Sequence, residues 1–479
     1  MSRLVTDHLP LLAGAPNGVK KLRELILQLA VTGRLDKFSG HAWRKFRLGD
    51  IGTWGSGGTP AKTHSEYYGG EIPWLVIGDL NDGLVTQAGT TITAKGLVNS
   101  SAKLIPPGTV LIAMYGSIGK MGVAGIHCAT NQAIAHCQPD ESKVCGDYLF
   151  VLLQSIRKQL VNQGQGLAQQ NISQKILKAT EIALPTITEQ RSIVAKVNEL
   201  MSLCDCLETR QSDAQAAHAR LVDELLGSLL QARDAEDFAE CWGRVKGSFD
   251  ALFTTEQSVE LLKRTILGLG MTGGLSARGS VDKWEKIKVA DAGHIKLGRQ
   301  RSPKDHHGPN MVQYLRVANV LEAKIDTTDV KSMNFTPEEQ KTFRLLPGDI
   351  LLNEGQSKEL VGRPAIFNDE VPGVCFQNTL LRFRCYDRVT PSYALKYFLH
   401  CMYSGIFQKY AQQTTNIAHL SSGRLATIDF LLPPLEEQRR IVAKVDEFMG
   451  LCDRIKAKIA RAQALNERLA GALVERAVL

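Results

Sequence analysis

The chain has 479 residues, which is enough for about three domains at ~150 residues each. Its content of 44% hydrophobic and 22% charged residues excludes a disordered or low-complexity protein. The net charge of +8 is compatible with a polyanionic partner such as nucleic acid, although an excess of this size is also ordinary for a solvated protein.

The sequence predicts a cytoplasmic protein without a membrane partner. The N-terminal MSRLVTDHLP lacks a basic-then-apolar signal, and no apolar run approaches the ~20 residues of a membrane span. The ten cysteines are scattered and form no CxxC pair. We therefore expect reduced core thiols rather than zinc ligands or disulfides.

The strongest pattern in the sequence is an internal repeat. Residues 185–205 (PTITEQRSIVAKVNELMSLCD) reappear at 433–453 as PPLEEQRRIVAKVDEFMGLCD, with fourteen of twenty-one positions identical. A weaker match aligns Val19–Leu35 with Val259–Leu275. The separation between the copies far exceeds any solenoid period, so the sequence predicts two tandem copies of one large unit.

Each copy is predicted to begin with a short helix, Val19–Leu35 or Val259–Leu275, and to continue into a globular region. In these regions, short β-rich runs such as GTVLIAMYG and GDILLNEG alternate with Gly, Pro and Asn turns. The predicted fold class is α+β, with two globular domains separated by a pair of long antiparallel coiled-coil helices. The expected segments are 1–39, 40–184, 185–281, 282–432 and 433–479.

A long helix is predicted to close each copy, from about Thr188 to Gln231 and from about Glu436 to the C-terminus. Neither segment has an internal proline, and apolar residues recur at heptad spacing, which predicts a coiled-coil pair. A helix of ~44 residues is ~65 Å long and would act as a spacer. His218 and Asn466 occupy equivalent seam positions, where a polar residue more often fixes register than performs chemistry. The predicted seam residues are Ile193, Val197, Leu200, Leu207, His218, Ile441, Val445, Phe448, Ile455 and Asn466.

The sequence shows no catalytic or metal-binding pattern. Gly116–Lys120 (GSIGK) lacks the spacing of a Walker A loop, and no HExxH, dinucleotide GxGxxG or Asn-Pro-Pro-Tyr-type methyltransferase motif occurs. Glu322-Ala323-Lys324 matches only the tail of a nuclease pattern and is interpreted as a surface pair. His306-His307 has no carboxylate or cysteine at ligand spacing, which favours a basic loop over a metal site.

Two kinds of segment are candidates for nucleic-acid contact. The loop at 298–307 (GRQRSPKDHH) is basic, and Arg suits guanine recognition whereas Lys usually contacts phosphate. Amide-rich stretches, Gln163–Asn171 and Gln412–Asn416, lie near the ends of the two globular regions. Asn and Gln suit adenine recognition but also ordinary turns, and a solvated surface loop remains the alternative for the basic segment.

Together these features resemble the specificity (S) subunit of type I restriction–modification systems, over nearly the whole chain. The resemblance is carried by GGTP…EYYGGEIPWL in the first globular region, by YLRVANV, GDILLNEG, VGRPAIF and QNTLLRFR in the second, by the PPLEEQRRIVAKVDE entry to a long helix, and by ILQLAVTGRL. The family implies two target-recognition domains, each reading one half of a split, asymmetric DNA sequence. It also implies that the segment 1–39 packs with the C-terminal helix, a circular arrangement that gives the repeat a pseudo-two-fold.

The resemblance further implies that this chain is not catalytic and binds no cofactor or metal. Its partners would be double-stranded DNA, two methyltransferase subunits and restriction subunits. S-adenosylmethionine, ATP and Mg would be bound by those subunits. The DNA-binding candidates are Lys62, Thr63, His64, Lys120, Gln165, Gln169, Asn171, Arg299, Arg301, Lys304, His306, His307, Lys358, Arg363, Thr414, Thr415 and Asn416.

Two alternatives remain open: a stand-alone DNA-modifying enzyme with an unrecognised active site, and a coiled-coil scaffold that does not bind DNA. Residues 234–253 have no counterpart elsewhere in the chain. They are interpreted only as a connector or an added helix.

Overall fold

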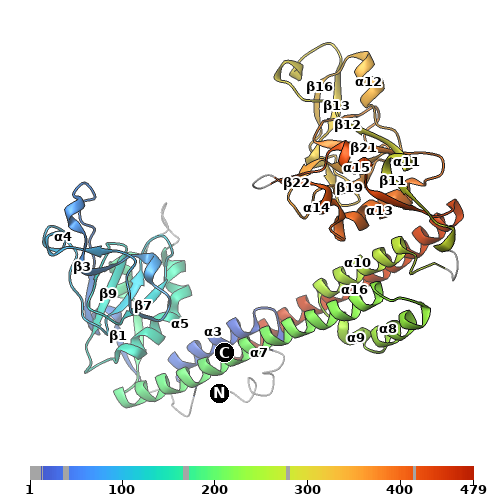
Figure 1. Cartoon of the computed structure of the whole chain (residues 1–479). Coiled ribbons are helices and arrows are strands. Elements are labelled where there is room, and N and C mark those ends of the chain that lie inside the picture. The colour runs from blue at the N-terminus through green and yellow to red at the C-terminus, as the bar shows by residue number, and fades with distance from the viewer. Residues whose placement is uncertain are drawn as a thin grey trace. The chain divides into compact units, whose positions relative to one another are not determined.

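A computed structural model of the chain describes residue 12 and residues 14–35, 43–164, 172–276, 281–413 and 417–478. Contacts divide the chain into two compact units, Met1–Ala214 with Ala462–Leu479, and Gln215–Arg461. Each unit holds one domain of mixed helix and sheet together with parts of both long helices (Figure 1).

The first globular domain is built on two sheets with strand orders β2-β9-β6-β7-β4 and β5-β3-β8. Strand β6 lies in the middle of the larger sheet and all four of its residues are buried, as expected for a strand covered on both faces. The strands are β2 (Gly52–Ser56), β3 (Tyr68–Leu75), β4 (Leu84–Val85), β5 (Thr91–Ile92), β6 (Val110–Ala113), β7 (Met121–Ala124), β8 (Ala129–Thr130) and β9 (Ile134–Pro139).

Helices and one strand pair complete this domain. Strand β1 (Arg44–Arg47) pairs antiparallel with β10 (Glu181–Leu184), so the two ends of the domain meet. Helix α5 (Gly146–Gly164) packs on the larger sheet, while the short helix α4 (Ala94–Val98) lies against the smaller one. Helix α6 (Gln174–Ala179) precedes β10.

The second globular domain repeats this plan. Its main sheets have the orders β12-β21-β17-β19 and β16-β13-β20, and β11 pairs with β24 as β1 pairs with β10. Two smaller sheets, β14-β15 and β18-β23-β22, are added. The strands are β11 (Glu285–Lys288), β12 (Gly293–Leu297), β13 (Met311–Leu315), β14 (Val320–Leu321), β15 (Lys324–Ile325), β16 (Lys331–Asn334), β17 (Ile350–Asn353), β18 (Gly355–Gln356), β19 (Pro364–Ile366), β20 (Cys375–Phe376), β21 (Leu380–Cys385), β22 (Gln412–Gln413), β23 (Ala418–His419) and β24 (Asp429–Leu432). The helices are α11 (Val289–Ala292), α12 (Pro337–Phe343), α13 (Pro391–Tyr403), α14 (Ile406–Tyr410) and α15 (Ser422–Ala426).

A three-helix packing accompanies each domain. In the first unit, α3 (Gly18–Val31) packs on α5 and on the early turns of α7 (Ile187–Leu230), and its Lys21 Nζ donates to the Glu467 carbonyl of α16 (Leu435–Val478) at 3.0 Å. In the second unit, α10 (Glu256–Thr272) packs on α13, on the early turns of α16 and on the last turns of α7. The structure thus confirms the α+β class and the internal repeat.

The heptad pattern predicts only part of the helix burial. Ile193, Val197 and Leu200 of α7 are buried, but against α3 and α5, and Ile441 and Val445 of α16 are buried against α10 and α13. Leu207, Phe448 and Ile455 are half-buried.

The two polar residues assigned to the seam do not pair across it. Asn466 is exposed, and the Nε2 atom of His218 lies 3.1 Å from the carbonyl oxygen of Ala251 in α9 (Phe249–Leu252). A role of these residues in helix register stays a prediction. The short helices, which the heptad spacing does not reveal, occupy the apolar faces of α7 and α16.

The segment without a counterpart forms α8 (Ala235–Gly247) and α9. Cys241, Val245 and Leu252 of these helices pack with Val222 and Leu226 of α7. Among the described residues, no helix is long and apolar enough to cross a bilayer, and no group of three metal-ligating side chains gathers. All ten cysteines are free.

The glycine that follows the first strand of each main sheet is predicted to be required for folding. A Cβ atom on Gly57 would lie 1.8 Å from the Thr130 carbonyl oxygen, and one on Gly298 would lie 2.2 Å from the Gln377 carbonyl oxygen. Because the backbone must shift to relieve this overlap, we expect Gly57→Ala to lower the free energy of unfolding by about 1–3 kcal/mol in denaturant titrations. Gly78→Ala, whose Cβ has no neighbour closer than 4.0 Å, is the control. Equal stability of the two variants would contradict the prediction.

Candidate nucleic-acid interface

The smaller sheet of the first domain carries an exposed group of cationic and aromatic side chains. Lys62, Thr63 and His64 are exposed in the loop before β3. The His64 ring stacks on Tyr67 at a centroid distance of 4.9 Å, and the Lys95 Nζ of α4 lies 5.9 Å from the Tyr67 ring centroid. Lysines suit phosphate contact and aromatic rings suit stacking on bases, so this arrangement has the chemistry of a nucleic-acid contact.

Glu66 lies within the same group. Its Oε1 atom is 3.4 Å from Lys95 Nζ and 3.3 Å from His64 Nδ1. A backbone hydrogen bond within the residue itself and the bonds from Lys95 and His64 lower the pKa of Glu66. The carboxylate therefore lies between the Lys95 and His64 side chains, which both stay exposed.

The corresponding loop of the second domain contains both exposed and internal cations. Lys304 and His307 are exposed, and His306 is half-buried and accepts a hydrogen bond from Arg301 Nε at 3.1 Å. Arg301 itself is also exposed. These four residues are available to a partner molecule on the side of the smaller sheet that carries α12.

Arg299 is a correction to the sequence-based assignment. Its side chain is only 13% exposed, with Nη1 3.0 Å from Asp305 and Nε 2.7 Å from Glu339 of α12, and its guanidinium lies 5.2 Å from the Phe335 ring centroid. Burial acts to lower the pKa of Arg299, but the two carboxylates outweigh it and the net shift is upward. Arg299 thus holds the loop to α12 and does not present a free guanidinium to a base.

A second candidate surface of this domain is the sheet β18-β23-β22. Strand β23 pairs with both β22 and β18, so the structure brings Gln412 and Gln413 of the amide-rich stretch to the same sheet as the strand that leads into Lys358. Lys358 is exposed, Arg424 donates to Gln412 Oε1 at 3.0 Å, and His419 Nδ1 lies 3.2 Å from Glu354 Oε2. Thr414, Thr415 and Asn416 lie outside the described residues.

A matching backbone hydrogen bond is made after the amide-rich segment of each domain. The Ile172 backbone N–H donates to the Met114 carbonyl at 3.0 Å, just as that of Leu420 donates to Glu354 at 2.8 Å. Ile172, the first described residue after the amide-rich stretch, therefore lies beside the end of β6, just before 115–120. Its candidates Gln165, Gln169 and Asn171 lie outside the described residues.

Two further candidates, Lys120 and Arg363, are only partly exposed. Lys120 Nζ donates to the carbonyl oxygens of Ile77 and Gly78 at 3.3 and 3.2 Å. Arg363 is half-buried, and burial lowers its pKa against the opposing charge of Glu322. The two internal bonds of Lys120 disfavour a role of this side chain in DNA contact, whereas Arg363 stays a candidate. Tyr67 and Lys95 were missed because stacking and the approach of α4 depend on the fold.

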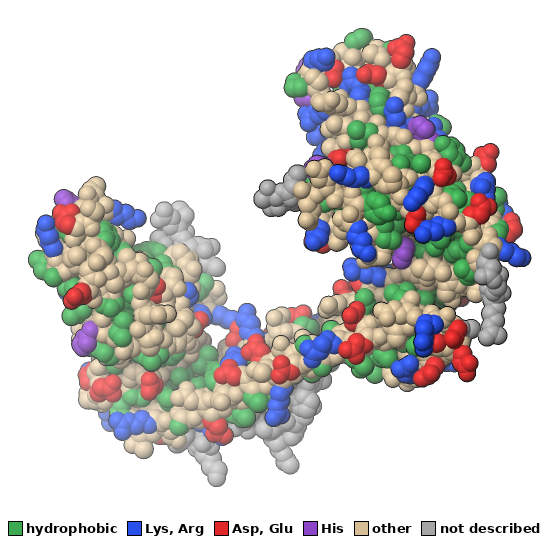
Figure 2. Space-filling model, in the orientation of Figure 1, with side chains coloured by type: hydrophobic (Ala, Val, Ile, Leu, Met, Phe, Trp, Pro, Cys, Tyr) green, Lys and Arg blue, Asp and Glu red, His purple; other side chains and the backbone are tan. Residues whose placement is uncertain are grey.

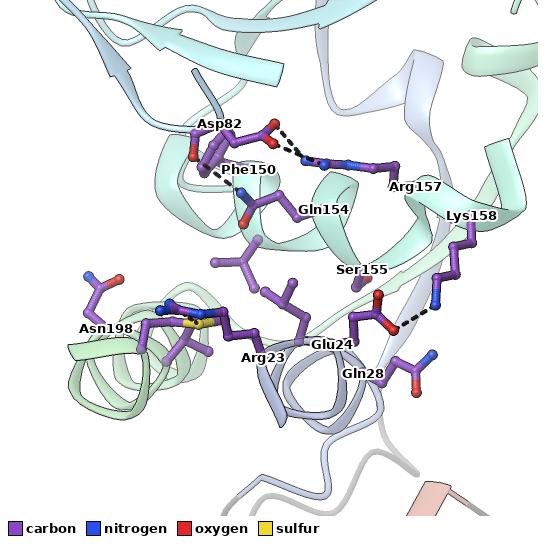
Figure 3. A pocket seen from close by; sticks show the side chains of 14 residues that line it. Arg23, Glu24, Gln28, Asp82, Phe150, Gln154, Ser155, Arg157, Lys158 and Asn198 are labelled. Atoms are coloured by element: carbon purple, nitrogen blue, oxygen red, sulfur yellow. Dashed lines mark hydrogen bonds and ion pairs between the residues drawn. The ribbon is translucent and has the colours of Figure 1, made fainter. Parts of the chain in front are cut away.

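A pocket of about 460 Å³ in the first unit lies between α3, α5 and α7 (Figure 3). Its cations are already paired: Arg157 makes bonds of 3.0 and 2.7 Å to the carboxylate of Asp82, and Lys158 Nζ lies 2.6 Å from Glu24. Because these charges are neutralised, the pocket is a poor site for a phosphate. On the face drawn in Figure 2, basic and acidic side chains are likewise interspersed over both domains.

Comparison with known proteins gives consistent matches. A profile described as "Type I restriction modification DNA specificity domain" matches residues 41–215 and 281–463, which is more than half of the chain. The chain is 25% identical over 386 residues to the type I restriction enzyme EcoEI specificity subunit of Escherichia coli, and 27% identical over 356 residues to the EcoAI specificity subunit of the same organism. These alignments cover 69% and 65% of this chain, and 64% and 60% of the two relatives, so the chain spans less than two thirds of their length.

A solved structure supports the same fold. This structure is described as showing the complex assembly and conformational transition of the type I restriction–modification system. One of its chains superposes on the present chain with a TM-score of 0.54 at 19% sequence identity. The superposition covers 91% of this chain and 97% of that chain.

Replacement of Arg299 is predicted to lower the free energy of unfolding, because its side chain forms internal ion pairs. Arg299→Ala leaves Asp305 and Glu339 without their shared cation in a largely buried place, so we expect a loss of about 3 kcal/mol in the free energy of unfolding. Arg301→Ala, at an exposed position in the same loop, should change it by less than about 0.5 kcal/mol. Denaturant titrations of both variants test this, and equal losses would contradict it.

The effect of Arg299→Ala is also predicted to depend on pH. Burial alone would raise the pKa of Glu339, but hydrogen bonds from Arg299 and from the Thr336 backbone lower it overall. A carboxyl group with a lowered pKa stabilises the folded state above its unfolded-state pKa, and this contribution is lost as the pH falls through the folded-state pKa. The stability difference between the unchanged protein and Arg299→Ala should therefore shrink below about pH 4, near the ordinary pKa of glutamate. A difference that stays constant on acidification would count against the role of Glu339.

Proposed function

The chain belongs to the type I restriction–modification DNA specificity family, and on this premise we propose that it is the subunit that selects the DNA target of such a system. In this proposal each globular domain reads one half of a bipartite, asymmetric sequence. The observation that carries it is the match of the family profile to two separate regions, each containing one globular domain of the same plan.

Different surface chemistry on a shared framework supports the assignment of one half-site to each domain. At corresponding loops, the first domain presents His64, Tyr67 and Lys95, whereas the second presents Arg301 and Lys304. Two domains with one backbone plan and unlike side chains are suited to two different sequences, because base readout depends on the groups presented in a groove.

The proposal includes the partners expected from the family. Two methyltransferase subunits and the restriction subunits would assemble with this chain in the cytoplasm. Those subunits would bind S-adenosylmethionine, ATP and Mg, and would carry out adenine methylation and DNA cleavage. The chain itself would contribute recognition and scaffolding.

Exchange of one globular region is predicted to change one half of the target. Residues 40–184 would be replaced by the equivalent region of a relative, and the methylated sequence would be mapped after assembly with the neighbouring operon products. We expect a new first half-site and an unchanged second one, because each domain has its own core and its own loops. Exchange of 282–432 is the matched control and should alter only the other half. A change in both halves from either exchange would contradict the assignment.

Removal of an exposed lysine from the second domain is predicted to weaken DNA binding. Lys304→Ala should lower affinity for the mapped target and reduce the slope of log affinity against log salt by about 1, since one phosphate contact is lost. Lys246→Ala, on the exposed surface of α8, is the control with equal charge change. Identical salt slopes for Lys304→Ala and the unchanged complex would remove this loop from the interface.

The alternative of a stand-alone DNA-modifying enzyme is tested by incubating the isolated chain with DNA, S-adenosylmethionine and Mg. Methylation or cleavage that copurifies with the chain would favour that alternative over the proposal. A scaffold without DNA binding would leave target selection unchanged in both region exchanges.

A further inference from the structure

A buried glutamine lies in the first turn of each long helix. Gln190 of α7 and Gln438 of α16 are the same residue of the repeated EQR sequence, and neither side chain is exposed to solvent. A buried amide is costly unless its donors and its acceptor are all paired. Both amides meet this requirement.

The Gln190 amide joins three segments of the first unit. Its Oε1 accepts the backbone N–H of Cys145 at 2.9 Å, and its Nε2 donates to the carbonyl oxygens of Lys143 at 2.9 Å and Pro185 at 3.0 Å. Lys143 and Cys145 lie just before α5, and Pro185 follows β10. The amide therefore ties α7 to both the helix and the last strand of the first domain.

The Gln438 amide makes the same contacts in the second unit. Its Oε1 accepts the backbone N–H of Thr390 at 2.8 Å and the hydroxyl of that residue at 3.2 Å. Its Nε2 donates to the carbonyl oxygens of Arg388 at 2.8 Å and Pro433 at 2.9 Å. Thr390 precedes α13 as Cys145 precedes α5, so the backbone bonds of the two glutamines are equivalent, and the Thr390 hydroxyl adds one bond in the second unit.

These hydrogen bonds restrain the direction of the long helix as well as its contact with the domain. Apolar side chains in the surrounding core attract without angular preference, whereas hydrogen bonds weaken steeply away from linear geometry. Bonds to two backbone segments of the domain therefore add an angular restraint to the core packing that holds the base of the helix.

The length of the helix makes that direction important for a split target. A helix of 44 residues is about 66 Å long, so a change of about 10° at its base moves its far end by about 11 Å. This displacement equals about three base pairs at ~3.4 Å per pair. Small changes in the angle at the first turn would thus change which half-site separation is accepted.

We propose that Gln190 and Gln438 are positioning residues, which set the direction of each long helix and so the number of base pairs between the two half-sites. This inference rests on the proposed function. The amides need not touch DNA or a cofactor, and their effect would pass through the helices that they orient.

The test uses the complex assembled with the neighbouring methyltransferase subunit. The target is first mapped with the unchanged chain, and methylation rates are then measured on duplexes that keep both half-sites and vary their separation one base pair at a time. Gln190→Met and Gln438→Met remove the amides at similar side-chain length. Thr390→Val is a milder variant, because it removes only the hydroxyl bond to Gln438.

Matched controls separate orientation from general loss of stability. Leu111→Ala and Leu351→Ala create cavities at equivalent, fully buried positions in the central strands of the two domains, away from the glutamines. Thermal unfolding is recorded for every variant, and rates are compared at a temperature at which all of them remain folded.

We expect the preference for the native separation over one that differs by one base pair to fall about tenfold in either methionine variant, which is a loss of about 1.4 kcal/mol in selectivity. Thr390→Val should show a smaller fall, while Leu111→Ala and Leu351→Ala should keep the native profile. If a methionine variant fails to assemble, Thr390→Val decides the question.

Two outcomes would overturn the inference: an unchanged separation profile in the glutamine and threonine variants, or the same broadening in the leucine controls. Failure of the proposed function would look different, because the unchanged chain would then direct no methylation to a split target. The two failures are therefore separable in the same experiment.

Discussion

Burial of the early turns of each long helix within a domain core is the constraint on which the rest of the structure depends. In the first unit one continuous apolar core contains Leu25 of α3, Tyr148 of α5 and Ile193 of α7. In the second, the corresponding core contains Leu267 of α10 and Ile441 of α16. A helix that leaves such a core has its base held by packing on several sides, so its direction is a property of the domain and not of the helix alone. The candidate DNA-contact loops are likewise held on sheets that belong to the same framework.

The two units keep their framework while the chemistry of individual contacts changes. Arg23 binds Asp205 in the first unit, and Lys263 binds Asp453 at the equivalent place in the second. Exposed ion pairs of this kind contribute little to stability, so either cation serves. The buried glutamines, by contrast, are identical in both copies and make the same bonds, because an unpaired amide or carbonyl in the core would be costly.

Unlike the buried glutamines, the side chains of the candidate DNA-contact loops differ between the two copies. The loop before β3 presents Lys62 and His64 beside the aromatic ring of Tyr67. In the loop before β13, Arg299 forms ion pairs with two carboxylates, and Lys304 is exposed to solvent. An arginine in a basic sequence is therefore not by itself a DNA contact. Its role depends on whether acidic residues distant in sequence, here Glu339, approach it in the fold.

The sequence by itself determined the internal repeat, the α+β class, the two long helices and the absence of a recognisable catalytic motif, because these depend on local periodicity and on comparison of the chain with itself. The tertiary structure alone decided which heptad positions are buried, since α3 and α10 cover faces of the long helices that the heptad pattern assigned to a seam with each other. It also decided that Arg299 and Lys120 make internal bonds, and that Tyr67 and Lys95 meet at one surface. These outcomes follow from contacts between segments far apart in the chain, and residue spacing within a single segment carries no information about them.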